Sequence, residues 1–151
     1  MVRSYKQADC ENIRALILSI LKQEYPFDMN AYADSDINDI RGTYCGKRSN
    51  FFVFEDGNRI VGTAGIKNDD KDTALLRRLF VDPHYRKKGI GTSLVKESLA
   101  FCKKSGYKKV VFRATDRMKS AINLIKRHGF IEKEKLEIAG FNIHLYLLKI
   151  K

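Results

Sequence analysis

The sequence predicts an α/β fold in which helices flank a central, mixed and mostly antiparallel sheet, within a single domain spanning 1–151. The length of 151 residues fits one domain with a sizeable core. Hydrophobic residues make up 44% and charged residues 31%, which suits a globular rather than a disordered chain. Segments with helical apolar spacing also alternate with short β-rich runs bounded by turn residues. The expected order is strand, helix, short helical region, three strands, helix, strand, helix and two strands.

The N-terminal part begins with a short strand, VRSY (2–5), and a helix that Asp9 is expected to cap and Pro26 to end. Helical spacing places on one face of this helix Ile13, Leu16, Ile17, Ile20 and Leu21. The next segment is loop-rich, and DSDINDI (34–40) favours a short helix within it.

Three strands are expected next, at 51–55, 59–67 and 73–81. The first two flank Asp-Gly-Asn, which is a hairpin signal. A helix follows the glycines after 88, and its buried face is predicted to hold Leu94, Val95, Ser98, Phe101 and Cys102. Gly106 fits the C-terminal cap of that helix.

The C-terminal part is expected to contain a strand at 108–114, a helix and a final hairpin of 130–138 with 141–150. Asp116 is expected to cap the helix and Gly129 to end it. The inward stripe of the helix is predicted to be Ala121, Leu124, Ile125 and His128.

The formal net charge of +11 is concentrated in one part of the chain. Residues 77–119 include thirteen Lys and Arg against three Asp and Glu, whereas 24–40 holds five acids and no Lys or Arg. This distribution suits a protein that holds an anionic ligand and attracts a cationic one. A nucleic-acid-binding protein would also be basic, but the lack of an aromatic-basic surface motif argues against specific nucleic-acid binding.

The three cysteines, Cys10, Cys45 and Cys102, are odd in number and far apart, so neither a metal site nor a disulfide framework is expected. Small buried hydrophobic side chains are the favoured interpretation. The chain starts with a polar segment and has no apolar run of membrane-spanning length. We therefore expect a cytoplasmic protein with no membrane partner.

The stretch VDPHYRKKGIGTSLV (81–95) has the character of an anion-binding site. Arg86, Lys87 and Lys88 precede two glycines at a point where a helix begins. Backbone N–H groups at the start of a helix point outward with the positive end of the helix dipole, and glycine lets a ligand approach them closely. The pattern matches neither the P-loop nor the dinucleotide-binding signature.

The motif Arg86-x-x-Gly89-x-Gly91, followed by Ala121-x-x-Leu124 and then Gly129-Phe130, resembles the GCN5-related N-acetyltransferase (GNAT) superfamily. The resemblance runs from about 51 to 130. It implies acetyl-coenzyme A as co-substrate, with its pyrophosphate on the glycine turn and its pantetheine arm along the preceding strand. The cofactor-binding residues so implied are Leu79, Phe80, Val81, Arg86, Lys87, Lys88, Gly89, Ile90, Gly91 and Thr92. Lys119 is a further candidate for the outer phosphates.

Two positions depart from the family pattern, and no catalytic acid or base is assigned. Many family members have a Tyr acid where this chain has Ile125, and a Glu base where it has Leu75. Neither side chain transfers a proton. Water-mediated proton removal by Glu24, Asp28 or an acid within 68–72 remains an alternative. His84 and His128 are interpreted as a surface and a helix-end histidine.

The acceptor is expected beside the strand 73–81 and the acid-rich segment 24–40. Strand alternation predicts that Arg77 and Arg78 point to opposite faces, with Arg77 on the face of Leu75 and Leu79. The candidate substrate-binding residues are Glu24, Asp28 and Arg77. Arg113, on the next strand, is a further arginine that could bind a carboxylate of the acceptor in the same way as Arg77. Acids and an arginine together suit a zwitterion, such as an amino acid or a peptide end.

The leading interpretation is an acetyl-coenzyme A dependent N-acetyltransferase that acts on a primary amine of a small molecule, amino acid or peptide. The alternative is a coenzyme A binding sensor or interaction module with reduced catalysis, and a nucleic-acid-binding protein is the third interpretation. No metal is expected. The apolar strand 141–150 is compatible with a homodimer.

Overall fold

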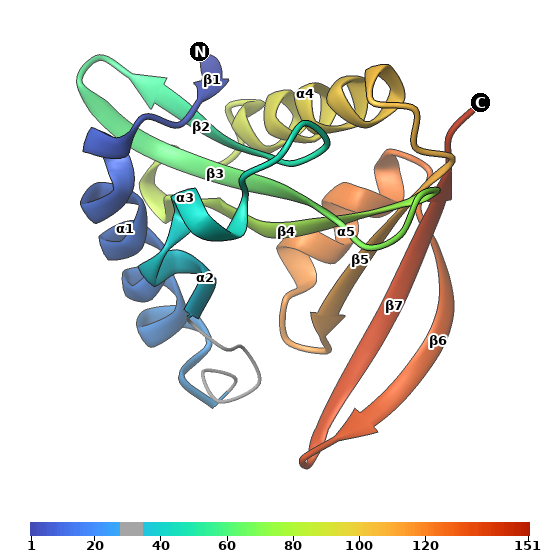
Figure 1. The fold of residues 1–151 in the computed structure, drawn as a ribbon. Helices are drawn as coiled ribbons and strands as arrows, with labels where there is room; N and C mark the ends of the chain where they lie inside the picture. Colours follow the sequence, from blue (N-terminus) through green and yellow to red (C-terminus); the bar gives the residue numbers. More distant parts are fainter. Residues whose placement is uncertain (28–34) are drawn as a thin grey trace.

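The computed structural model describes residues 1–27 and 35–151, and it confirms the predicted order of elements (Figure 1). The helices are η1 (Gln7–Asp9), α1 (Cys10–Glu24), α2 (Ser35–Asn38), α3 (Ile40–Thr43), η3 (Pro83–Tyr85), α4 (Ile90–Lys104) and α5 (Lys119–Arg127). The strands are β1 (Val2–Ser4), β2 (Asn50–Asp56), β3 (Arg59–Asn68), β4 (Thr73–Val81), β5 (Lys109–Thr115), β6 (Ile131–Ile138) and β7 (Phe141–Lys149). In the described part of the chain, no helix is both long and apolar enough to cross a bilayer.

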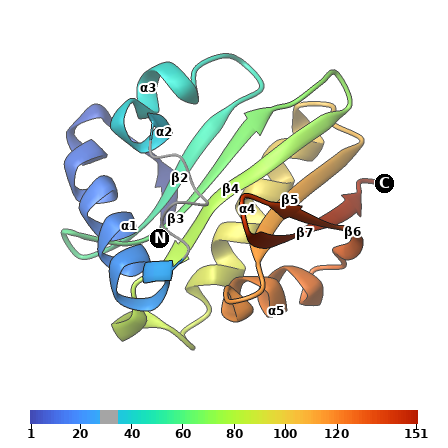
Figure 2. The ribbon, with the colours of Figure 1, turned by 90° about the horizontal axis from the view of Figure 1, so that it is seen from below.

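The strands form one seven-stranded sheet in the order β1-β2-β3-β4-β5-β7-β6. The β4–β5 pair is parallel and the other neighbouring pairs are antiparallel. Figure 2 shows α1, α2 and α3 on one face of the β2–β4 region, and α4 and α5 on the other. The β6–β7 hairpin extends beyond the rest of the molecule (Figure 1).

The two faces of β3 show why the helices pack so closely on the sheet. A Cβ at Gly62 would lie 2.8 Å from Leu94 Cδ1 of α4. A Cβ at Gly65 would lie 2.8 Å from Tyr44 Cε1, at the end of α3. Since alternate residues of a strand face opposite sides, Gly62 marks the α4 face and Gly65 marks the α1–α3 face.

The predicted helix faces are largely confirmed, but two predicted caps are wrong. Asp9 precedes α1, yet its side chain accepts from the backbone N–H of Lys6 and from Arg3 instead of capping the helix. Asp116 bonds to His144 and Asn142 rather than to the first turn of α5. In both cases the carboxylate binds side chains of other segments instead of the first turn of the helix. The helical pattern of the local sequence does not reveal these partners.

The cysteines and the inner face of α5 bring smaller differences. Cys102 is fully buried as predicted, and burial raises the pKa of its thiol to about 12. Cys45 is exposed, so its prediction as a buried side chain is wrong. Ile122, absent from the predicted stripe of α5, is buried beside Leu124 and Ile125.

Strand β4 contains a bulge at Arg78. Gly65 of β3 pairs with Arg77, but Thr63, two residues away, pairs with Phe80, so β4 carries one extra residue between them. Arg78 has a φ of 54°, in the left-handed region. The Thr63 hydroxyl donates a 2.7 Å hydrogen bond to the Arg78 carbonyl, which the bulge takes out of the regular ladder.

The bulge overturns the predicted alternation around the two arginines. Both guanidinium groups approach Asp36 of α2, so Arg77 and Arg78 do not point to opposite faces of the sheet. Beyond the bulge the alternation of side chains is shifted by one residue, so Phe80 rather than Leu79 lies on the same face of β4 as Arg77.

Strands β4 and β5 diverge just before the bulge. Their pairing runs from Thr73↔Lys109 to Leu76↔Phe112 and then stops, although β4 continues to Val81. Strand β5 instead stays paired with β7 as far as Thr115↔Ile143. The opening between the two strands positions the candidate site.

Candidate functional site

The turn from β4 into α4 is built to expose backbone donors. Asp82 accepts a 2.9 Å hydrogen bond from the His84 N–H and thereby starts the short helix η3. After it, Lys87 and Gly89 adopt left-handed φ values of 62° and 80°. Left-handed residues interspersed among right-handed ones turn successive N–H groups towards one point, where an anion can bind.

The N-terminus of α4 continues this set of donors. Gly89 is the N-cap residue and has no side chain to cap the helix. The Ser93 N–H donates the first helical bond, to the Gly89 carbonyl at 3.0 Å. The N–H groups of Ile90, Gly91 and Thr92 therefore precede the helical ladder and point with the positive end of the helix dipole.

A cavity of about 330 Å³ lies at this turn, between the end of β4 and α5. Its lining includes nine of the ten predicted cofactor-binding residues: Leu79, Phe80, Val81, Arg86, Lys87, Gly89, Ile90, Gly91 and Thr92. Lys88 is not in the lining, and its Nζ lies 5.3 Å from the centre of the Tyr85 ring. Lys119 is exposed at the start of α5 and also lies outside the lining.

Nearly all of the predicted cofactor-binding residues thus line one cavity. The two glycines of the motif serve it in different ways. Gly89 is required by its φ of 80°, and a Cβ there would meet nothing within 4 Å. A Cβ on Gly91 would lie 2.7 Å from Leu124 Cδ2 of α5, so Gly91 lets α4 and α5 close around the cavity.

The Arg86 side chain is held by the end of α1. Its two Nη atoms donate to both carboxylate oxygens of Glu24, at 2.6 and 2.7 Å, and its Nε donates to the Val81 carbonyl at 3.1 Å. Two of the predicted site residues, one assigned to the cofactor and one to the acceptor, therefore bind each other. Bidentate pairing of this kind fixes the orientation of the guanidinium plane.

The same cavity is also lined by residues that were not predicted to bind the cofactor, although Ala121 and Leu124 among them belong to the sequence motif. They are Tyr25, Tyr85, Met118, Ser120, Ala121, Asn123, Leu124 and Arg127. Four of the α5 members follow the spacing i, i+3, i+4 and i+7 from Ser120, which marks a single face of a helix. That spacing was the available signal, because Ala121 and Leu124 of the motif already placed this helix at the site.

A second cavity, of about 640 Å³, opens where β4 and β5 diverge. Its lining residues are Leu75, Leu76, Arg77, Arg78, Leu79, Phe80, Val111, Phe112, Arg113, Ala114, Met118, Leu136, Ile138 and Ile143. It shares Leu79, Phe80 and Met118 with the first cavity. The two cavities therefore meet beside the unpaired stretch of β4.

A buried polar cluster supports the wall of the second cavity. Arg78 donates to both oxygens of Asp36, at 2.6 and 2.9 Å, and the Tyr44 hydroxyl donates to Asp36 at 2.8 Å. Burial alone would raise the pKa of Asp36, but the hydrogen bonds and charges of its partners, Arg78 above all, hold that pKa below its usual value. Burial and the nearby Asp36 charge raise the pKa of the Tyr44 phenol far above 10.

The remaining sequence candidates lie as follows. Ile125 is fully buried, and Leu75 lines the second cavity without offering a proton-transfer group. His128 ends α5 half-buried, and burial lowers the pKa of its imidazole. His84 is 88% exposed, which confirms its interpretation as a surface histidine. Asp28 lies outside the described residues.

Two cavities thus meet at a strand opening, and one of them is lined by the backbone donors of the turn before α4. A family model described as the acetyltransferase (GNAT) family matches residues 14–130. The chain belongs to this family, which confirms the resemblance seen in the sequence.

Individual relatives agree with the family and with the fold. An uncharacterized N-acetyltransferase of Methanocaldococcus jannaschii is 38% identical over 90 residues, which cover 56% of this chain and 40% of that protein. The crystal structure of a GNAT-family acetyltransferase from Staphylococcus aureus Mu50 matches with a TM-score of 0.89 at 24% identity, covering 100% of this chain and 99% of that one. A Salmonella typhimurium protein solved with its cofactor acetyl-CoA matches with a TM-score of 0.79 at 17% identity, covering 100% and 94%. The chain spans between 40% and 57% of the length of the curated relatives it matches.

Proposed function

We propose that this chain is an N-acetyltransferase that transfers the acetyl group of acetyl-coenzyme A to a primary amine of a small molecule, amino acid or peptide. The observation that carries the proposal is the meeting of the two cavities at Leu79, Phe80 and Met118. The cavity at the glycine turn suits the phosphates, and the cavity between β4 and β5 suits the acceptor. Family membership and the acetyl-CoA bound by the Salmonella typhimurium protein support the choice of donor.

The proposed reaction is direct attack within a ternary complex. The neutral amine nitrogen attacks the thioester carbonyl carbon, a C–N bond forms and the C–S bond breaks. The products are the N-acetyl amide, the coenzyme A thiol and one proton released from the ammonium form of the acceptor. Backbone N–H groups in 79–81, on the stretch of β4 that β5 leaves unpaired, are the proposed donors to the developing oxyanion.

Proton transfer in this proposal does not depend on a dedicated acid. The departing thiolate is a tolerable leaving group because a thiol pKa is about 8.5. An alkyl ammonium has a pKa near ~10.4, so its proton must be removed before attack. Water reaching the opening between β4 and β5 is the proposed acceptor of that proton.

The test is thiol release from acetyl-coenzyme A with a panel of primary amines, together with mass spectrometry of the acetylated products. We expect amine-dependent thiol release and a mass increase of one acetyl group on the acceptor. Calorimetry should show coenzyme A binding that weakens at high salt, since the turn and its cations would hold phosphates. A protein that binds no coenzyme A at low ionic strength would refute the proposal.

The alternative is a coenzyme A binding sensor with reduced catalysis, and one observation favours it. Ile125 and Leu75 stand where many family members carry their acid and base, and the structure describes Ile125 as fully buried. Tight coenzyme A binding without turnover on any amine of the panel would select this alternative. Turnover on a single amine, with product identified, would exclude it.

A further inference from the structure

The register across the β4–β5 opening brings two arginines to the same side. Leu75 pairs with Val111 in the last stretch of parallel pairing. Two residues further on, Arg77 and Arg113 lie on the same face of their strands as Leu75 and Val111. Both arginines line the 640 Å³ cavity, so they face the space between the diverging strands.

This cavity has an excess of positive charge. Its described lining includes Arg77, Arg78 and Arg113 but no Asp or Glu. Arg78 forms an ion pair with Asp36, and an Nη atom of Arg77 lies 3.9 Å from the same carboxylate. Arg113 is exposed, and no carboxylate of the described residues lies within 4.0 Å of its guanidinium.

The acids expected to attract a cationic acceptor are largely engaged elsewhere. Glu24 binds Arg86, Asp36 binds Arg78, and Asp39 accepts from the Gly42 N–H. Asp28 and Asp34 lie outside the described residues. The described acids of 24–40 therefore leave the cavity wall cationic.

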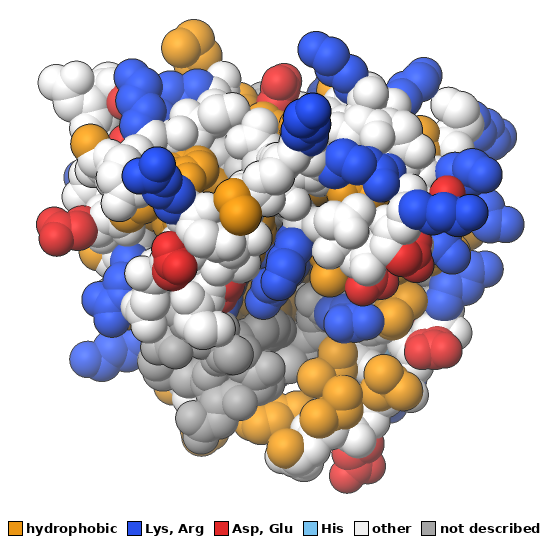
Figure 3. Space-filling model, in the orientation of Figure 1, with side chains coloured by type: hydrophobic (Ala, Val, Ile, Leu, Met, Phe, Trp, Pro, Cys, Tyr) orange, Lys and Arg blue, Asp and Glu red, His pale blue; other side chains and the backbone are white. Residues whose placement is uncertain are grey.

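The opposite wall of the cavity is apolar and partly uncovered. It is formed by the β6–β7 hairpin, where Leu136 is 39% and Ile138 52% exposed, together with Ile143. Figure 3 shows a hollow on this face with Lys and Arg side chains above it and hydrophobic side chains below it, over the hairpin. An apolar group that covers these side chains would contribute about 25 cal/mol per Å² of apolar surface removed from water.

We propose that the acceptor is an amine that carries both a carboxylate and an apolar substituent, as a hydrophobic α-amino acid does. This inference rests on the acetyltransferase function proposed above. Arg113 and Arg77 bind the carboxylate, and Leu136, Ile138 and Ile143 cover the apolar substituent. The surrounding positive charge also disfavours the ammonium form of the acceptor and so raises the fraction of neutral, nucleophilic amine.

The experiment compares three acceptors that differ at one group: L-phenylalanine, L-phenylalanine amide and 2-phenylethylamine. Each has the same ring and a primary amine, but only the first carries a carboxylate. We expect kcat/KM for phenylalanine to exceed the other two values by about tenfold or more, as one charge-assisted hydrogen bond allows. Glycine, which has the carboxylate but no apolar substituent, should react less efficiently than phenylalanine.

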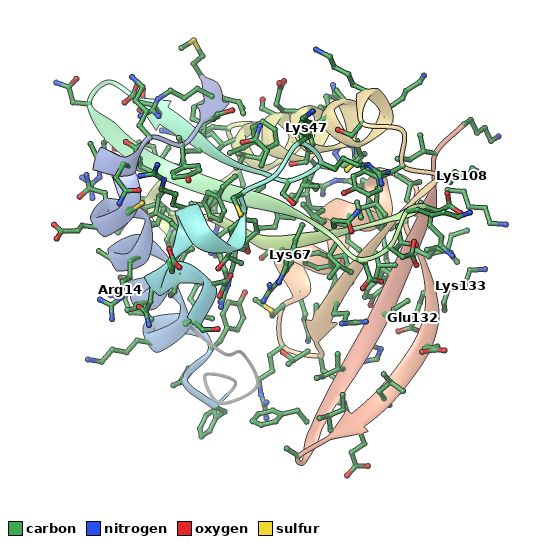
Figure 4. The ribbon with its side chains drawn as sticks, viewed as in Figure 1. Arg14, Lys47, Lys67, Lys108, Glu132 and Lys133 are labelled. Carbon is green, nitrogen blue, oxygen red and sulfur yellow. The ribbon has the colours of Figure 1, made fainter. Side chains whose placement is uncertain are left out.

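Variants of Arg113 test whether this residue causes the preference for an acceptor with a carboxylate. Arg113→Gln should raise KM for phenylalanine and bring its kcat/KM close to that of the amide, whereas Arg113→Lys should restore part of the preference. Lys133→Gln is the matched control, because it removes one positive charge from β6 outside the cavity lining. Figure 4 labels Lys133 and Lys108 on the outer side of the C-terminal strands.

Binding of N-acetyl-L-phenylalanine and of its primary amide, followed by calorimetry, tests the inference without turnover. Stronger binding of the acid, lost in Arg113→Gln and kept in Lys133→Gln, would support the inference even in a protein that does not catalyse transfer. Equal binding of the two ligands, or equal kcat/KM for phenylalanine and 2-phenylethylamine, would overturn it. If only 2-phenylethylamine were acetylated, the proposed acceptor would be wrong but the acetyltransferase function would remain supported. Absence of coenzyme A binding would refute the acetyltransferase function itself.

Discussion

Arg78 donates to both carboxylate oxygens of Asp36, at 2.6 and 2.9 Å, and each of the two side chains is only 4% exposed. The pair joins α2 to the bulge of β4, which are 42 positions apart in the sequence. The bulge in turn accompanies the opening between β4 and β5. One buried ion pair thus links the N-terminal helices to the site.

Replacing Asp36 with Asn should destabilise the protein strongly. The change leaves the buried Arg78 guanidinium without its counter-charge, and breaking a buried pair from one side costs about 3–5 kcal/mol. Urea unfolding followed by circular dichroism would measure the difference. Asp39→Asn is the control, since Asp39 is exposed and Asn is an equally good capping residue. Equal losses in the two variants would contradict the role assigned to Asp36.

The contribution of Asp36 to stability should depend on pH with a defined sign. Its pKa is lower in the folded protein than in the unfolded chain, where a carboxyl titrates near ~3.9. The contribution is therefore fully present above about pH 4 and is lost as the pH falls through the folded pKa. The unfolding free energies of the wild type and of Asp36→Asn should converge once the pH is below the pKa of Asp36 in the folded protein. A constant gap down to strongly acidic pH would show that the charge is not the cause.

Gly91→Ala should weaken coenzyme A binding through Leu124. The new methyl would displace the Leu124 side chain, which lines the same cavity. In a Leu124→Ala background the substitution should have a much smaller effect, a coupling that a double-mutant cycle with calorimetry measures.

Gly89→Ala serves as the comparison for that cycle. It creates no contact within 4 Å but places a Cβ at a φ of 80°, at a cost of about 1–2 kcal/mol. Leu124→Ala should therefore not rescue it. Rescue of both glycine variants to the same extent would contradict the separate roles given to Gly89 and Gly91.

Glu24→Gln should strengthen coenzyme A binding several-fold, an effect of about 1 kcal/mol. The substitution removes the negative charge that now neutralises Arg86, so the guanidinium is released towards phosphate. Loss of stability should be small, because the two side chains are 28% and 27% exposed. Isothermal titration at two salt concentrations would show a steeper salt dependence than in the wild type. Weaker binding would instead indicate that Glu24 holds Arg86 in the orientation that the cofactor needs.

His144 of β7 should titrate above the usual histidine pKa. The hydrogen bond to Asp116 is the main cause that raises its pKa, and the bond to Glu132, labelled in Figure 4, adds to it. The stability that this arrangement supplies is complete below the unfolded pKa of about 6.5 and is lost as the pH rises through the folded value. Nuclear magnetic resonance titration should show a larger decrease of the pKa in Asp116→Asn than in Glu132→Gln. Glu134→Gln, on the same strand, should leave it unchanged.

Much of the fold was predictable because local signals and the global fold agree. Strand β4 lies where the apolar run 73–81 and the following Asp-Pro predicted it, and α4 begins directly after Gly89. The residues that line the cavity at the glycine turn could be listed from a short motif whose members are close in sequence. Such sites depend on local backbone geometry, which sequence patterns describe well.

The acceptor side was less predictable because it depends on partners distant in sequence. Period-two alternation misplaced Arg77 and Arg78, since the bulge at Arg78 accompanies tertiary contacts with Thr63 and Asp36 that the local sequence does not reveal. The pairing of Glu24 with Arg86 was missed for the same reason. Asp116 was expected to cap a helix, but the distant His144 binds it, and Asp9 binds Arg3 and Lys6, which precede it, instead of capping α1.

An arginine in a left-handed conformation in the middle of a strand has a consequence for how this molecule can change. A glycine adopts that backbone conformation at no steric cost, whereas for Arg78 it is strained, and the hydrogen bonds to Asp36 of α2 help to offset the strain. The four-residue helix α2, near the N-terminus, therefore braces the strand at the opening where we propose that the acceptor binds. Substitutions in α2 that never touch a substrate can retune selectivity by letting this strand straighten.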